Sequence, residues 1–258
     1  MATRTVVFIH GAWMAPTSWD GFKGAFGAAG YRTLTPAWPL MDRPVAELRA
    51  SPHPDFGRLG VGEIADHHEA LIRSLPEKPL LVGHSFGGLI VQMLLDRGIG
   101  AAGIAFDPAP IAGVTADPTS LGAALPAVLR WNGWNTPFML SREGFANRFA
   151  NTVPAADLGG YYDRLVVPAP GRIFYQAALM SGTGIRPARR NAPLLITSAD
   201  KDRTVAPPLA RQAYAIQRAS PARTDFKTLA DRSHFLCVEK GWEEVAKAAL
   251  DWAADIAK

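Results

Sequence analysis

The stretch that decides the fold is Leu80–Gly88, which reads LLVGHSFGG. Its first residues are apolar and predict a short buried strand. Gly83, Ser85 and Gly87 follow with the pattern G-x-S-x-G, and the apolar run 89–95 predicts a buried helix. A strand that turns sharply into a helix through this pattern holds its serine in a strained conformation between small neighbours. We therefore expect Ser85 to be a nucleophile, with a structural glycine-rich turn as the alternative.

Working outward from this turn, apolar runs alternate with amphipathic stretches along the chain. This alternation is typical of an α/β protein with a mostly parallel sheet of about six strands flanked by helices. The expected strands are 6–9, 31–36, 80–82, 103–108, 193–197 and 226–229, and the expected helices are 16–30, 62–75, 89–95, 209–218 and 242–256. Residues 40–60 are rich in proline and are predicted to form a loop.

The alternation of strand and helix stops between Pro108 and Asn191. This stretch is far longer than the usual loop of about 2–6 residues between a strand and a helix. We predict an all-helical cap at 108–190, inserted between two parts of one α/β core, 1–107 and 191–258. The segments expected to be helical are 121–131, 142–151, 155–166 and 173–180. Many aromatic residues lie in this cap, and a few of them are expected to line an apolar pocket.

Bulk properties limit the partners of the chain. Of its 258 residues 48% are hydrophobic and 19% are charged, as in ordinary globular proteins, and the net charge is +4. The densest basic spot is Arg186, Arg189 and Arg190, which we interpret as a solvated turn and not as a nucleic-acid site. No nucleic-acid partner is therefore expected.

The N-terminal residues Met1–His10 lack the pattern of a secretory signal peptide, and no apolar run reaches membrane-spanning length. The single cysteine, Cys237, rules out an internal disulfide and fits a reducing compartment. These features predict a cytoplasmic protein without a membrane partner. They leave open whether it is a monomer or a homodimer.

Asp66, His67 and His68 are adjacent on a predicted helix and suggest a metal site at first sight. Side chains of neighbouring helical residues diverge by roughly 100°, so the three cannot all bind one ion. We interpret them as a polar outer face and expect no metal site.

A serine hydroxyl needs a base to accept its proton, and the base needs an acid to orient it. His234 follows the last predicted strand and is the expected base, while Asp202 follows the strand before it and is the expected acid. The order serine, acid, histidine is the one that this sheet topology uses. Asp107, which ends the strand beside the elbow strand, and Asp200 remain alternatives for the acid.

With these residues the chain resembles an α/β-hydrolase of the carboxylesterase-like type. The resemblance covers His10-Gly11, the elbow at 83–87, the Asp202 segment and the Ser233-His234-Phe235 segment. Such hydrolases often begin with a β-hairpin, and because the first predicted strand starts at Val6 we expect this hairpin to be absent.

The resemblance implies an oxyanion hole formed by the backbone N–H groups of Phe86 and of a residue after Gly11. Ala12 is the expected residue, and Trp13 is the alternative. His10 is expected to orient this loop and not to act as a base. No metal and no organic cofactor is implied. The expected lining of the substrate pocket consists of Trp13, His84, Trp131, Trp134, Phe138 and Phe235.

The function expected from these features is hydrolysis of a small or medium apolar carboxylic ester or lactone through an acyl-enzyme on Ser85. Because a fold does not determine a reaction, a lyase, a C–C hydrolase or a cofactor-free haloperoxidase with the same triad remains an alternative. A small-ligand receptor without useful turnover is the third hypothesis.

Overall fold

A computed structural model describes residues 4–115 and 118–257, and at 121, 123 and 124 only the backbone. Its centre is a six-stranded sheet in which every neighbouring pair is parallel. In spatial order the strands are β2 (Arg32–Leu34), β1 (Thr5–Ile9), β3 (Leu80–His84), β4 (Ala102–Phe106), β7 (Leu194–Ala199) and β8 (Thr224–Leu229). The α/β architecture expected from the sequence, with about six mostly parallel strands, is confirmed.

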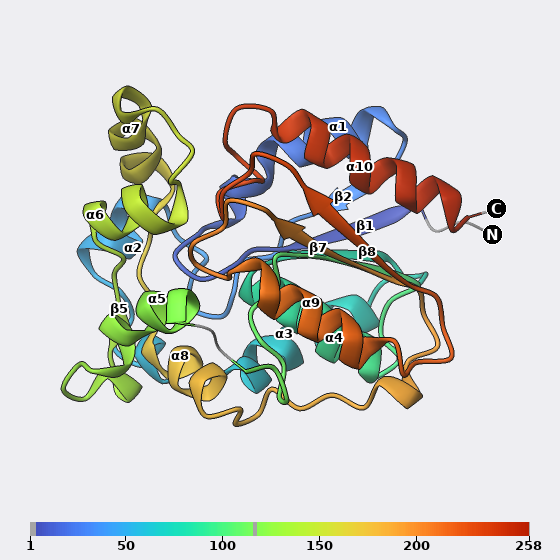
Figure 1. Cartoon of the computed structure of the whole chain (residues 1–258), viewed down its shortest axis with the longest axis horizontal. Coiled ribbons are helices and arrows are strands. Elements are labelled where there is room, and N and C mark those ends of the chain that lie inside the picture. Colours follow the sequence, from blue (N-terminus) through green and yellow to red (C-terminus); the bar gives the residue numbers. More distant parts are fainter. Residues whose placement is uncertain (1–3, 116–117, 258) are drawn as a thin grey trace.

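Helices cover both faces of the sheet (Figure 1), which explains why its central strands are buried throughout and mostly apolar. On β1, Val6 and Phe8 face one hydrophobic cluster, and Val7 and Ile9 face the other. The first cluster is covered by α1 (Asp20–Ala28), which extends the turn η1 (Pro16–Trp19), and by α10 (Trp242–Asp255). The second is covered by α3 (Val61–Arg73), α4 (Phe86–Asp96) and α9 (Pro207–Gln217).

The register of the central strands brings the elbow and the end of β4 together. His84 pairs with Phe106 across β3 and β4. One step further, the backbone N–H of Ser85 donates to the carbonyl of Phe106 at 2.9 Å, and that of Ala109 donates to the carbonyl of Ser85 at 3.0 Å. Asp107, the first of the two residues between Phe106 and Ala109, therefore leaves the sheet directly beside Ser85.

Residues 108–190, called the cap segment below, join β4 to β7, and helices α5, α6, α7 and α8 of this segment lie at one end of the sheet in Figure 1. Helices are present in all four expected places, although the second is a single turn of α-helix continued by a π-helical turn. The cap segment also contains a short antiparallel pair, β5 with β6, which sequence patterns did not predict. Its elements are α5 (Pro118–Val128), η3 (Gly133–Asn135), β5 (Pro137–Phe138), α6 (Arg142–Gly144), the π turn η4 (Phe145–Phe149), α7 (Ala155–Leu165), β6 (Ala169–Pro170), α8 (Gly171–Ala178) and η5 (Pro187–Arg189).

Three local expectations were wrong. The stretch 40–60 is not only loop, since it contains α2 (Val45–Ala50) and η2 (Phe56–Arg58). His68 is fully buried instead of lying on a polar outer face, because its Nδ1 can bond to the carbonyl of Ile64 at 2.8 Å. Arg190 is also buried, because its guanidinium donates to acceptors from several surrounding segments, among them the Gln217 side chain at 3.0 Å.

None of the helices in the described part of the chain combines the length and apolarity needed to cross a bilayer.

Candidate active site

Ser85 sits at the sharp turn between β3 and α4. Its backbone has φ 56° and ψ −120°, which is a strained conformation for a residue with a side chain. The turn is also tightly packed, because a Cβ built on Gly83 would lie 2.2 Å from the carbonyl oxygen of Gly87. The structure therefore has the strand–turn–helix geometry of a nucleophile elbow, with Ser85 just before the first residue of the helix.

His234 and Asp202 form a buried pair. The His234 ring donates from Nδ1 to Oδ2 of Asp202 over 2.6 Å, and both side chains are fully shielded from solvent. Asp202 is fixed in turn by the backbone N–H groups of Thr204 and Val205, which donate to its Oδ1 at 2.7 and 2.9 Å. With a proton on Nδ1, the neutral ring presents Nε2 as an acceptor, which is the tautomer that a general base needs.

The surroundings of His234 keep its ring neutral. Phe149, from the π turn of the cap segment, packs edge-on against the ring at a centroid distance of 4.8 Å, and the ring of His84 lies 4.5 Å away. Burial lowers the pKa of His234 to about 4. Nε2 has no hydrogen-bond partner among the described residues, so it is not bonded to Ser85 in this state. Such contacts often tighten only when substrate is bound.

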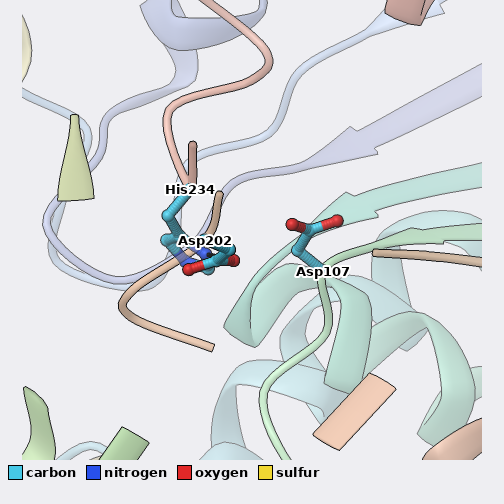
Figure 2. Close-up of side chains that lie close together, drawn as sticks. All are labelled: Asp107, Asp202 and His234. Atoms are coloured by element: carbon cyan, nitrogen blue, oxygen red, sulfur yellow. Dashed lines mark hydrogen bonds and ion pairs between the residues drawn. The ribbon is translucent and has the colours of Figure 1, made fainter. Parts of the chain in front are cut away.

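The three carboxylates considered for the acid occupy different positions. Asp200 is exposed and lies 3.8 Å from the Lys201 ammonium. Asp202 bonds to His234 directly. Asp107 also reaches the site, since an oxygen of its carboxyl lies within 4.8 Å of the ligand atoms of both Asp202 and His234. Figure 2 shows the Asp107 side chain beside the overlapping Asp202 and His234.

Sequence patterns gave no sign of Glu239, which anchors the loop that carries His234. This buried carboxylate accepts hydrogen bonds from the backbone N–H and the hydroxyl of Ser233, at 2.9 and 2.6 Å. It also bonds to the hydroxyl of Thr152, so it ties this loop to the cap segment. The signal that could have found it is an acidic residue in the apolar run after His234.

Replacement of Glu239 by alanine should loosen this loop. It leaves the buried donors of Ser233 unpaired, which costs about 1–3 kcal/mol of unfolding free energy, and we expect a roughly tenfold lower kcat because His234 is less well positioned. Thermal unfolding and ester kinetics measure the two effects. Glu243→Ala, on the first turn of α10, is the control and should change neither by much. Wild-type kinetics in Glu239→Ala would contradict the anchoring role.

The loop after β1 lies against the elbow. A Cβ on Gly11 would come within 2.8 Å of the Ser85 Cβ, so only glycine permits this approach. Next to Gly11, His10 can donate from Nδ1 to the Gly11 carbonyl at 3.0 Å, and its Nε2 accepts from the backbone N–H of Trp38 at 3.3 Å. Both ring nitrogens of His10 are thus engaged in holding the loop, as expected from the sequence. This packing places Ala12 and Phe86 on segments that adjoin Ser85.

An apolar cavity of about 140 Å³ opens beside Ser85. Its walls come from the loop after β1, the start of α4, the loop after β4, and helices α8 and α9. None of its described lining residues is charged; they are Trp13, Ser85, Phe86, Ala109, Pro110, Val114, Ser120, Phe174, Ala177, Ala178, Met180, Thr204, Val205 and Leu209.

Of the six residues expected in the pocket, the structure places only Trp13 in this lining. Trp131 is corrected most clearly, because its side chain is 97% exposed. Trp134 instead packs against Tyr175, outside the lining.

The other three lie behind the cavity wall. Phe138 packs edge-on against Trp13 at 5.9 Å and supports the wall from outside. His84 lines a separate space of about 10 Å³. Phe235 is buried among aromatic rings of the cap segment. Pocket lining depends on how the cap packs on the core, which sequence patterns do not give.

A strained serine on a strand–helix turn, next in sequence to His84, whose ring lies 4.5 Å from the ring of the buried His234, is typical of the α/β-hydrolase class of proteins. The chain belongs to the alpha/beta hydrolase family, whose profile matches residues 6–248. No curated protein has a matching sequence.

Solved structures show the same fold at low sequence identity. A methylesterase from Arabidopsis is 18% identical with a TM-score of 0.69, over 97% of this chain and 98% of its own. A monoacylglycerol lipase from Paleococcus ferrophilus is 18% identical with a TM-score of 0.71, over 97% and 94%. A pyrethroid hydrolase from Sphingobium faniae is 17% identical with a TM-score of 0.69, over 98% of each chain.

Proposed function

We propose that the chain is a serine esterase that hydrolyses small or medium, uncharged apolar esters or lactones through an acyl-enzyme on Ser85. The observation that carries this proposal is the buried His234–Asp202 pair at 2.6 Å, in a protein whose strained Ser85 borders an uncharged apolar cavity. The shared fold with a methylesterase, a lipase and a pyrethroid hydrolase supports esters as the first substrates to test.

In the proposed mechanism, His234 accepts the proton of the Ser85 hydroxyl at Nε2 while Oγ attacks the ester carbonyl. The Asp202 carboxylate stabilises the resulting imidazolium through Nδ1. The N–H of Phe86, at the start of α4, and that of Ala12 bind the oxyanion. His234 then donates the proton to the leaving alcohol. Water, activated by the same ring, attacks the acyl-enzyme and releases the acid.

The cavity selects the substrate class. Burying a carboxylate or an ammonium group among these walls would cost several kcal/mol, because no described lining side chain carries a compensating charge. An uncharged alkyl or aryl group, in contrast, gains about 25 cal/mol for each Å² that it buries. We therefore propose neutral esters as substrates and place the apolar part of the ester in this cavity.

The decisive experiment compares two p-nitrophenyl esters of similar size, the neutral butyrate and the negatively charged hemisuccinate, together with labelling by a phosphonate ester. We expect turnover of the butyrate at least tenfold above that of the hemisuccinate, and mass spectrometry should find the label on Ser85. Labelling elsewhere, or no ester turnover, would contradict the proposal. Turnover of a carbon–carbon substrate alone would favour a C–C hydrolase.

Ala177, on α8, offers a test of where the substrate lies. Ala177→Leu places extra volume in the cavity, and we expect kcat/KM to fall about tenfold or more for the butyrate but less than threefold for the acetate. Ala254→Leu, on the exposed side of α10, is the control for adding the same side chain. Equal losses on both esters in Ala177→Leu would show that the acyl group binds elsewhere.

A further inference from the structure

We propose that Asp107 is a second acid of this site, a positioning residue that shares one proton with Asp202 and takes over part of its role when Asp202 is lost. This inference rests on the proposed function, because its main measurement is ester hydrolysis. It begins from the observation that the histidine has two buried carboxyls beside it and bonds directly to only one of them.

The fold brings the two carboxyls together. Asp107 directly follows β4 and Asp202 lies three residues after β7, and these strands are neighbours in the sheet. Their side chains and that of His234 have ligand atoms within 4.8 Å of one another (Figure 2). The exposed fractions of Asp107 and Asp202 are only 1% and 3%. Asp107 is therefore within electrostatic reach of the imidazolium that forms during catalysis.

Asp107 is held in this place against the preference of its backbone. Its φ of 43° lies in the left-handed region, which is unfavourable for most residues with a side chain. Two donors from β7 fix the carboxyl, since the hydroxyl of Thr197 donates to Oδ1 at 3.0 Å and the N–H of Ala199 donates to Oδ2 at 2.9 Å. The strained backbone and these bonds together direct the carboxyl to one position.

Two negative charges at this spacing would repel each other strongly in a buried site. Among the described residues, neither carboxyl forms an ion pair with a lysine or an arginine. Burial and the neighbouring Asp202 carboxyl raise the pKa of Asp107 well above its usual range, and burial also raises that of Asp202. The other titratable groups at the site are His84, Cys237 and Glu239. Burial lowers the pKa of His84 and raises that of Cys237, so both are neutral, and Glu239 carries no positive charge.

The hydrogen bonds indicate which carboxyl holds the shared proton. An oxygen of Asp107 and an oxygen of Asp202 lie within 4.8 Å of each other, and two carboxyls can share a proton only if one is the donor and the other the acceptor. Asp202 already accepts two backbone N–H groups and the His234 ring, which favour its charged form. Asp107 accepts only two donors, and one of these is a hydroxyl, so we place the shared proton on Asp107 and the charge on Asp202 in the resting protein.

When Asp202 is replaced by asparagine, Asp107 loses the neighbouring charge that kept it protonated. Its proton passes to solvent as the pH rises, and the carboxylate then faces the imidazolium within 4.8 Å. The serine proton still moves to Nε2 of His234 and from there to the leaving group. Asp107 contributes charge and orientation only, and it forms no covalent bond.

The test is the set of wild type, Asp107→Asn, Asp202→Asn and the double variant, assayed on p-nitrophenyl butyrate against pH. Asparagine tolerates the left-handed backbone of position 107 and can still donate to Asp202, so Asp107→Asn should lose only about three- to tenfold. We expect a loss of about 10²-fold in Asp202→Asn and about 10⁴-fold in the double variant, the value typical of a lost triad acid.

The pH profile separates this role from a merely structural one. The activity of Asp202→Asn should rise with pH as Asp107 ionises, because burial still raises the pKa of this carboxyl and keeps it neutral at lower pH. The double variant should lack this rise. Asp200→Asn combined with Asp202→Asn is the matched control and should behave as Asp202→Asn alone. A double variant within threefold of Asp202→Asn at all pH values overturns the proposal.

A measurement without substrate distinguishes failure of this inference from failure of the esterase proposal. Infrared difference spectra of wild type against Asp107→Asn at about pH 7 should show the carbonyl band of a protonated carboxylic acid in the wild type only. This result would stand even if no ester were turned over, or if the double variant did not fold. Absence of the band would show that Asp107 holds no proton, which would contradict the proposed sharing of a proton with Asp202.

Discussion

Ser85→Ala should lower kcat on p-nitrophenyl butyrate by about 10⁴- to 10⁶-fold, while the protein remains folded and KM changes little. Alanine removes the attacking oxygen but keeps a small side chain in the strained turn, so α4 and the cavity stay in place. A residual rate above that of buffer is expected, because the oxyanion N–H groups and the binding site persist.

The measurement for this variant needs single-turnover kinetics, since traces of wild type would dominate a steady-state assay. Ser120→Ala is the matched control, because this serine lines the same cavity on the cap side. We expect Ser120→Ala to keep activity within about tenfold of wild type and to keep the phosphonate label. Equal rates for Ser85→Ala and wild type would remove Ser85 from the mechanism.

Gly87→Ala should unfold the protein or destabilise it by about 4 kcal/mol or more. A Cβ at this position would lie 2.0 Å from the carbonyl oxygen of Ile9 and 2.8 Å from that of His10. Both obstacles are backbone atoms at the end of β1, so no side-chain rotation can relieve the clash. The loop with Ala12 would have to move away from the elbow.

Chemical denaturation of the purified variant, or its absence from the soluble fraction, measures this effect. Gly24→Ala is the matched control, because a Cβ there meets open space on the exposed side of α1. It should leave stability unchanged or raise it by about 0.5–1 kcal/mol, the usual helix preference of alanine over glycine. A Gly87→Ala protein as stable as Gly24→Ala would show that the end of β1 is not held against the elbow.

The elements with strong local patterns could be predicted from the sequence. The run before Gly83 and the apolar residues after Gly87 determine a buried strand and a buried helix, and the structure confirms both. The alternation of strand and helix predicts a parallel sheet, which the structure confirms, and the family match confirms the resemblance drawn from the motifs. The catalytic roles of Ser85, His234 and Asp202 stay predictions that rest on the position of each residue after its strand.

Other features depend on contacts between distant segments and could not be predicted. Trp131 is as apolar as Trp13, yet one is exposed and the other lines the cavity, because only the packing of the cap segment separates them. Arg190 is buried with distant acceptors around its guanidinium, and His68 is buried with Nδ1 bonded to a main-chain carbonyl, whereas composition favours an exposed position for both. Glu239 acquires its role through Ser233 and Thr152, and the second of these is 87 residues away.

The two-residue pair of β5 and β6 has a consequence for how this protein can diverge. Because Phe138 faces Ala169, the chain leaves and re-enters the body of the molecule at one point. An insertion whose ends already meet is readily exchanged, since doubling its length adds only about 0.6 kcal/mol of closure entropy. Residues 139–168 can therefore change in length, provided that their contacts with the rest of the chain, such as that of Thr152 with Glu239, are replaced. Any replacement must also supply an aromatic ring in the place of Phe149, because this ring packs against His234.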